Sequence, residues 1–267
     1  MEILQFDFMQ NALFASLLVS IICGIIGTLI VINRMVFIAG GIAHGSYGGI
    51  GLAFYFGIAP MLGASLFALF LGWIIATITY QNTSRIDSLI GVLWAFGMAF
   101  GIILTDLTPG YNVDLMSYLF GAILSVSKED LYAIGFVLAI VFSFALLFYK
   151  QLLAMSFDAE FAKLRGLHVK FLYFALVLII ALGVVIIIRA VGLILVIALL
   201  TIPPYIAEKF TNSMGSMMIV SSIFSCIFCL LGLYISYAFN LSSGACIILI
   251  ATLTFFIQMI VGIFLKK

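Results

Sequence analysis

Long apolar runs with only short breaks between them fill this 267-residue chain. A helix needs about 20 consecutive apolar residues to cross the hydrocarbon core of a bilayer. Hydrophobic residues make up 66% of the chain and charged residues only 8%, whereas soluble domains are about half apolar and a quarter charged. The sequence therefore predicts an all-α, polytopic transmembrane protein that forms one domain over residues 1–267. Nine runs approach the length of a span: 11–32, 35–56, 61–80, 88–107, 131–149, 171–188, 191–207, 213–238 and 242–264.

Two apolar segments depart from this regular pattern. The run at 115–124 is too short to cross a bilayer, so we interpret it as a re-entrant half-helix whose ends must be shielded by protein or a cavity. The run at 191–207 contains Pro203 and Pro204, and proline inside a helix removes a hydrogen bond and clashes with the preceding turn. We expect that span to be broken or bent, in a fold of eight or nine spans plus the half-helix.

The lysines and arginines predict the orientation in the cytoplasmic membrane, because loops rich in them stay on the cytoplasmic side. Counting nine spans outward from the most basic loop, 150–170, places nine of the eleven basic residues inside. The N-terminus then lies outside and the C-terminus inside. An eight-span count would move Lys266 and Lys267 to the outside, which fits the rule less well.

The same topology makes the outer face acidic, with Asp106 and Asp114 among its carboxylates. An acidic surface raises the local concentration of cations, so these two residues are candidates for cation entry. Alternatively, the acidic balance only reflects the exclusion of basic residues from outer loops. The sequence leaves both interpretations open.

The cytoplasmic segment 156–168 (SFDAEFAKLRGLH) is typical of a short amphipathic helix. Ser156 is expected to cap its start and Gly166 to end it. Phe157, Phe161 and Leu164 fall on one face of such a helix. That face could dock in a groove of another protein or lie on the lipid surface.

His44 lies about nine residues into the second predicted span, or roughly 14 Å at 1.5 Å per residue, near the middle of the bilayer. Ionisable groups at that depth usually face a bundle interior or a transport pathway. Glycine rows surround it, with Gly40 and Gly48 four residues before and after. Imidazole suits zinc and, less well, manganese. The alternative is a buried histidine bonded to a backbone carbonyl or to Ser46.

Several function classes find no support in the sequence. The chain contains no P-loop motif, so ATP would have to be bound by another subunit. The segment from Gly63 to Ser65 has the G-x-S form seen in intramembrane serine proteases, but the spacing to His44 as a base does not match. No basic cluster is large enough to predict nucleic-acid binding.

Several segments resemble the membrane permease of the metal-ion ABC importers, which carry zinc, manganese or iron(II). The resemblance covers nearly the whole chain, and the run that ends at Pro203 is its most specific part. The matching segments are 34–51 around His44, 113–121 (VDLMSYLFG), Val126-Ser-x-x-Asp130, 190–203 (AVGLILVIALLTIP), Gly232-Leu-x-x-Ser236-Tyr and 243–245.

The resemblance implies a homodimeric permease, folded like the permease of the vitamin B12 importer, without its own ATPase and without a permanently bound cofactor. Its implied partners are two cytoplasmic ATPase subunits and an extracytoplasmic metal-binding protein. Segment 156–168 would be the coupling helix that fits a groove on the ATPase. The residues implied in coupling are Asp158, Glu160, Phe161, Leu164 and Gly166.

The chain departs from the family pattern at one position. Family members commonly carry an aspartate four residues before the motif histidine, and here that residue is Gly40. His44 without the carboxylate makes zinc the predicted cargo, with manganese or iron(II) as alternatives. Two other functions remain as alternatives: a related permease for a metal chelate or vitamin, and an intramembrane hydrolase that uses Ser65.

Overall fold

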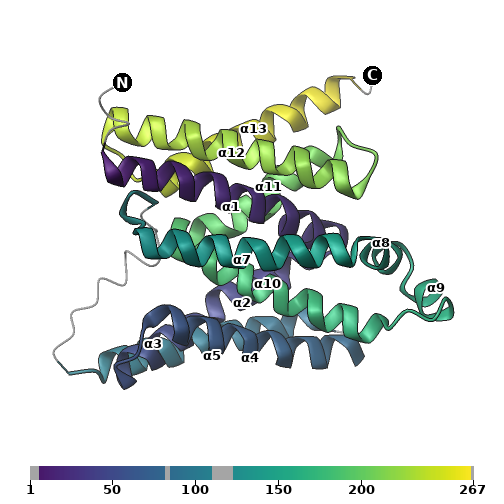
Figure 1. The fold of residues 1–267 in the computed structure, drawn as a ribbon, viewed down its shortest axis with the longest axis horizontal. Coiled ribbons are helices and arrows are strands. Elements are labelled where there is room, and N and C mark those ends of the chain that lie inside the picture. The colour runs from purple at the N-terminus through teal and green to yellow at the C-terminus, as the bar shows by residue number, and fades with distance from the viewer. Residues whose placement is uncertain (1–5, 82–84, 110–122, 266–267) are drawn as a thin grey trace. The chain divides into compact units, whose positions relative to one another are not determined.

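The computed structural model describes residues 6–81, 85–109 and 123–265, and within them the chain is helical without strands (Figure 1). The elements are α1 (Asp7–Ile32), α2 (Val36–Gly45), α3 (Tyr47–Phe56), α4 (Pro60–Gln81), α5 (Ile86–Asp106), η2 (Ile123–Ser125), α7 (Lys128–Leu147), α8 (Tyr149–Phe157), α9 (Ala159–Leu164), α10 (Val169–Val191), α11 (Leu193–Glu208), α12 (Met214–Phe239) and α13 (Ser243–Leu265). The predicted all-α class is confirmed.

Eight helical segments in the described part are long and apolar enough to cross a membrane. One of them, Val36–Phe56, consists of α2 and α3 together. The remaining predicted span corresponds to α11, whose 16 residues extend about 24 Å at 1.5 Å per residue, less than the roughly 30 Å of a hydrocarbon core. The predicted range of eight or nine spans is confirmed, while the orientation of the termini stays a prediction.

The prolines of α11 do not break the helix, so of the two outcomes expected at 203–204 the break is wrong and the bend stays a prediction. α11 runs from Leu193 to Glu208 with both prolines inside it. Proline at 204 leaves the carbonyl of Leu200 without its helical donor. That carbonyl and the ring of Pro204 face Gly27 of α1, where a Cβ would lie 2.7 Å and 2.8 Å from them. Glycine at position 27 therefore leaves the space in which α1 lies closely against this part of α11.

The contacts divide the chain into two compact units. The first comprises Met1–Val31, Met116–Phe142 and Ile187–Lys267, and the second Ile32–Leu115 and Ser143–Ile186. In the first unit, α11, α12 and α13 pack on one another. In the second unit, α3 packs on α4 and α5, and the three lie side by side in Figure 1. The single domain over 1–267 stays a prediction.

Segment 156–168 contains a shorter helix than expected. α8 continues to Phe157, so Ser156 lies inside α8 and does not cap α9. Asp158 caps α9 instead, since its Oδ1 accepts a hydrogen bond from the backbone N–H of Phe161 at 2.9 Å. At the other end, the N–H groups of Gly166 and Leu167 donate to the carbonyls of Lys163 and Ala162. This is the Schellman arrangement, and Gly166 takes the positive φ of 81° that it requires.

The predicted half-helix at 115–124 lies mostly outside the described residues. Its last two residues belong to the short helix η2.

Candidate functional site

His44 lies at the end of α2, next to a break in the second candidate span. α2 ends at Gly45, Ser46 separates the helices, and α3 begins at Tyr47. The hydroxyl of Ser46 donates to the carbonyl of Ala43 at 2.7 Å. Nδ1 of His44 is buried and has no hydrogen-bond partner within the described residues. The alternative in which the imidazole bonds to a carbonyl or to Ser46 is therefore not seen at Nδ1.

The imidazole of His44 stacks on the indole of Trp94 from α5. The ring centroids are 4.0 Å apart and the planes differ by 9°. A parallel stack covers a face of the imidazole and leaves the ring edge, where its nitrogens donate, accept or bind a metal in the ring plane, uncovered by the indole. The arrangement therefore keeps a buried Lewis base without a partner in a fixed orientation.

Glycines bring the backbone of α5 against α2 and α3. A Cβ at Gly97 would overlap the carbonyl oxygen of Gly45, and a Cβ at Gly51 would overlap that of Gly101. Glycine at such positions lets helices in lipid approach closely. Gly45 of α2 and Gly51 of α3 thus lie in close backbone contact with α5, which carries Trp94.

The other candidates for the cation path do not join His44 in a cluster. In the described part of the chain, no group of three or more His, Cys, Asp and Glu side chains could hold a metal ion. Asp106 is exposed at the end of α5, and Asp114 lies outside the described residues. Gly40, which replaces the carboxylate of the family motif, is buried in α2. Within the described residues, His44 is therefore a ligand candidate that is not part of such a cluster.

The residues implied in coupling lie on and around α9. The helix presents Phe161 and Leu164 with 50% and 87% of their surfaces exposed. Nζ of Lys163 lies 2.7 Å from Oε1 of Glu160 in an exposed ion pair. Asp158 and Gly166 cap the two ends of the helix. The described chain thus offers a short capped helix with an apolar exposed face.

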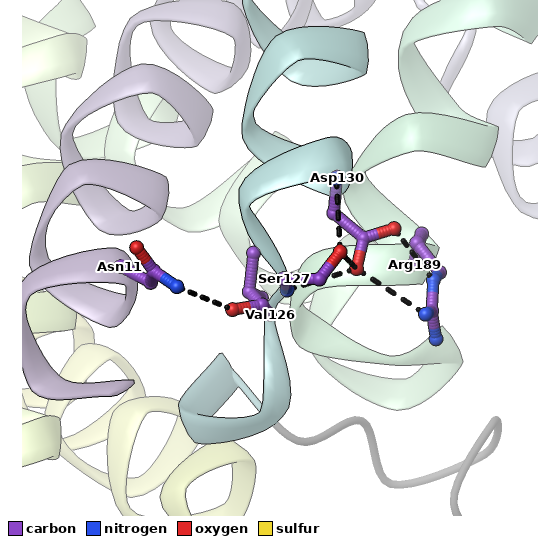
Figure 2. A network of polar contacts seen from close by, with 5 residues as sticks. All are labelled: Asn11, Val126, Ser127, Asp130 and Arg189. Carbon is purple, nitrogen blue, oxygen red and sulfur yellow. Dashed lines mark hydrogen bonds and ion pairs between the residues drawn. The ribbon is translucent and has the colours of Figure 1, made fainter. Parts of the chain in front are cut away.

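A polar network in the first unit was not predicted from the sequence (Figure 2). Both oxygens of Asp130 accept hydrogen bonds from the guanidinium of Arg189, at 3.1 Å and 3.2 Å. The hydroxyl and backbone N–H of Ser127 also donate to Asp130, and Ser127 accepts from the N–H of Asp130. Nδ2 of Asn11 on α1 donates to the carbonyl of Val126 at 3.2 Å. The S-x-x-D spacing before an apolar run is a capping signature that could have revealed its centre.

The hydrolase alternative gains no support from the geometry. Ser65 lies half-buried on α4, and no hydrogen bond between Ser65 and His44 occurs among the residues that the structure describes. A serine nucleophile needs such contact with its base.

Comparisons with known proteins agree with the sequence pattern. The model of the ABC 3 transport family matches residues 5–262. An uncharacterized membrane protein of Synechocystis sp. is 50% identical over 97% of this chain and 92% of its own length. The manganese transport system membrane protein MntC of Listeria monocytogenes is 35% identical over 96% and 91%. The structure of PsaBC from Streptococcus pneumoniae in complex with Fab is similar with a TM-score of 0.85 and 35% identity, covering 95% and 91%.

The family match extends over nearly the whole chain and includes both compact units. Permeases of ABC transporters are transport components and not enzymes, which confirms the prediction that this chain has no catalytic activity of its own. The chain belongs to the ABC 3 transport family, and its resemblance to the permeases of metal-ion ABC importers is thereby confirmed.

Proposed function

We propose that this chain is the permease subunit of an ATP-driven importer that passes manganese(II) through the membrane. The observation that carries the proposal is the buried Nδ1 of His44, which has no partner in the described chain. An imidazole nitrogen without a hydrogen bond at membrane depth is costly, and it is an available ligand for a divalent metal ion. The other ligands would come from water or from a second copy of the chain.

The choice of manganese rests on a relative and not on the site. MntC of Listeria monocytogenes, 35% identical, is named for manganese transport. A lone imidazole suits zinc better than manganese, which was the reason for the zinc prediction. We therefore keep zinc as the second candidate, and competition between the two ions in one uptake assay ranks them.

The proposed complex contains two copies of the chain, two cytoplasmic ATPases and an extracytoplasmic metal-binding protein. α9 would dock on an ATPase through Phe161 and Leu164, whose exposed apolar surfaces suit a groove. In this arrangement the N-terminus lies outside and the C-terminus inside. Asp106, exposed at the end of α5, would then lie on the outer side, where it can attract cations.

The test compares uptake of radioactive manganese by cells that carry the complete importer with wild-type chain or His44→Ala. We expect at least a roughly tenfold loss for His44→Ala, because even losing an outer partner of a metal ligand costs about 10- to 100-fold. Ser65→Ala is the matched control and should transport normally. Intact uptake by His44→Ala would contradict a bare-ion path and favour the chelate or vitamin alternative. Loss of function in Ser65→Ala alone would revive the hydrolase alternative.

A further inference from the structure

We propose that Trp94 positions His44 for metal binding, and that its indole ring sets the plane in which the imidazole presents Nδ1. The inference rests on the proposed function, because it assigns Trp94 a role only if His44 meets the metal ion. The juxtaposition that carries it is the parallel stack, with ring centroids 4.0 Å apart and an interplanar angle of 9°.

The stack restricts the imidazole in the way that metal binding needs. A metal ion approaches a histidine nitrogen along its lone pair, within the plane of the ring. The indole covers a face of the imidazole and so opposes tilting, while the in-plane direction at Nδ1 stays free of protein donors and acceptors. A metal ligand held in its bound orientation loses less conformational entropy when the ion arrives.

The hydrogen bond of Trp94 directs its only donor away from Nδ1 of His44. An indole has a single donor, its Nε1–H. In this chain that donor is directed to Sδ of Met98, one turn further along α5, at 3.1 Å. The donor of Trp94 is therefore satisfied away from the imidazole. Trp94 supplies a flat surface to His44 without competing for its nitrogen.

The backbone around the two rings fixes their separation. Gly45 directly follows His44 and meets Gly97, three residues after Trp94, at a distance that leaves no room for a Cβ. Phe37, from the first turn of α2, adds a second ring near Trp94, with centroids 6.3 Å apart. α2 and α5 thus meet at two neighbouring points: the close backbone contact between Gly45 and Gly97 and the ring stack of His44 on Trp94. The glycine contact sets the distance that the stack requires.

Ordinary packing of two rings is the competing explanation, and direct metal binding separates it from positioning. The experiment measures equilibrium binding of Mn²⁺ to the purified permease–ATPase complex, with free Mn²⁺ followed by electron paramagnetic resonance. Trp94→Leu removes the flat aromatic face, and Trp94→Phe keeps it while losing the indole N–H. Trp73→Leu is the matched control, because it changes the chain's other tryptophan, which is 54% exposed on α4.

We expect Trp94→Leu to weaken Mn²⁺ binding at least about tenfold, as for other residues that orient a metal ligand. Trp94→Phe should recover most of the affinity, and Trp73→Leu should bind as the wild type does. In a His44→Ala background, Trp94→Leu should add no further loss, because the ring it positions is gone. If Trp94→Leu does not assemble, Trp94→Met serves the same comparison.

Three results would overturn the positioning role. The first is unchanged Mn²⁺ affinity in Trp94→Leu, and the second is an equal loss of Mn²⁺ affinity in Trp94→Phe and Trp94→Leu. The third is a further loss of Mn²⁺ affinity when Trp94→Leu is added to His44→Ala. Failure of the proposed function looks different. In that case His44→Ala itself binds Mn²⁺ as the wild type does, whatever the outcome at Trp94.

Discussion

The polar network at Asp130 and the imidazole at His44 are both built from polar groups in a largely apolar chain, yet they differ in completeness. At Asp130, both carboxylate oxygens are bonded, by Ser127 and by the guanidinium of Arg189. At His44, the buried Nδ1 has no partner among the described residues. One region satisfies its polar atoms within the fold, and the other leaves one available.

Under the proposed function, this difference separates a stabilising network from a binding site. A buried polar atom left without a hydrogen bond costs about 1–3 kcal/mol, a cost that folds often accept where function needs the free group. A buried polar atom without a hydrogen bond does not by itself identify a binding site, since the hydroxyls of Thr28, Ser221 and Ser225 are also buried without partners in the described part of the chain. His44 differs from these hydroxyls because an imidazole nitrogen is a type of group that binds divalent metal ions and because its ring stacks on Trp94.

The strongest test of the comparison removes the charge partner in the network. Arg189→Ala leaves the carboxylate of Asp130, whose side chain is only 11% exposed, without its counter-charge. Breaking a buried pair costs about 3–5 kcal/mol. Because the Arg189 side chain is 40% exposed, we expect a smaller loss of about 1.5–3 kcal/mol, the range for hydrogen bonds to charged groups. Thermal melting of the purified complex in detergent measures it.

Lys128→Ala is the control for Arg189→Ala. Its ion pair with Asp7 spans 3.7 Å between side chains that are 70% and 80% exposed, and such pairs contribute about 0–1 kcal/mol. Metal uptake per folded complex should be unchanged in both variants. A variant at Arg189 that melts normally but no longer takes up manganese would break the comparison, because the network would then serve transport directly.

The second test concerns the close contact between Gly97 of α5 and Gly45, the residue after His44. α5 provides a matched pair of glycines for it. Gly97→Ala places a Cβ against the backbone of Gly45, whereas a Cβ at Gly91 meets nothing within 4 Å. Overpacking of this kind costs about 1–3 kcal/mol. Alanine at 91 should instead stabilise the helix by up to about 1 kcal/mol, since alanine has the higher helix propensity.

The two alanine variants are compared by melting temperature and by Mn²⁺ binding. Gly97→Ala should lower both, because a shifted backbone separates the imidazole from the indole. Gly91→Ala should leave Mn²⁺ binding unchanged. If Gly97→Ala lowers the melting temperature but binds Mn²⁺ normally, the stack does not depend on this contact.

The spans and His44 could be predicted because each depends on neighbours in sequence. Apolar runs predict transmembrane helices through their length. A histidine nine residues inside such a run is a candidate functional residue because ionisable residues are rare at that depth. The stack with Trp94 depends on a contact between separate helices. Trp94 lies in another apolar run, and nothing in its local pattern shows which residue of α2 it meets.

The wrong predictions fail for a similar reason. The break expected at Pro203 and Pro204 follows from local rules, whereas α11 continues through both prolines as one helix and packs closely against Gly27 of α1. Ser156 and Asp158 both have cap-forming side chains, and the continuation of α8 to Phe157 leaves Asp158 as the cap. The pair of Asp130 and Arg189 joins residues 59 positions apart, beyond the reach of any spacing rule.

The smallest expected effect concerns Ser127 and tests how much its hydroxyl adds to the stability of the network around Asp130. Ser127→Ala removes a cap that accepts from the N–H of Asp130 and donates to its carboxylate. Loss of such a cap costs typically about 1 kcal/mol, less than the loss of Arg189, because Arg189 still neutralises the carboxylate. Ser127→Thr retains a hydroxyl and should melt close to the wild type. A loss in Ser127→Ala as large as in Arg189→Ala would mean that the hydroxyl, and not the charge pair, keeps Asp130 in place. The charge of Arg189 would then contribute no more to the stability of the network than the hydroxyl of Ser127 does.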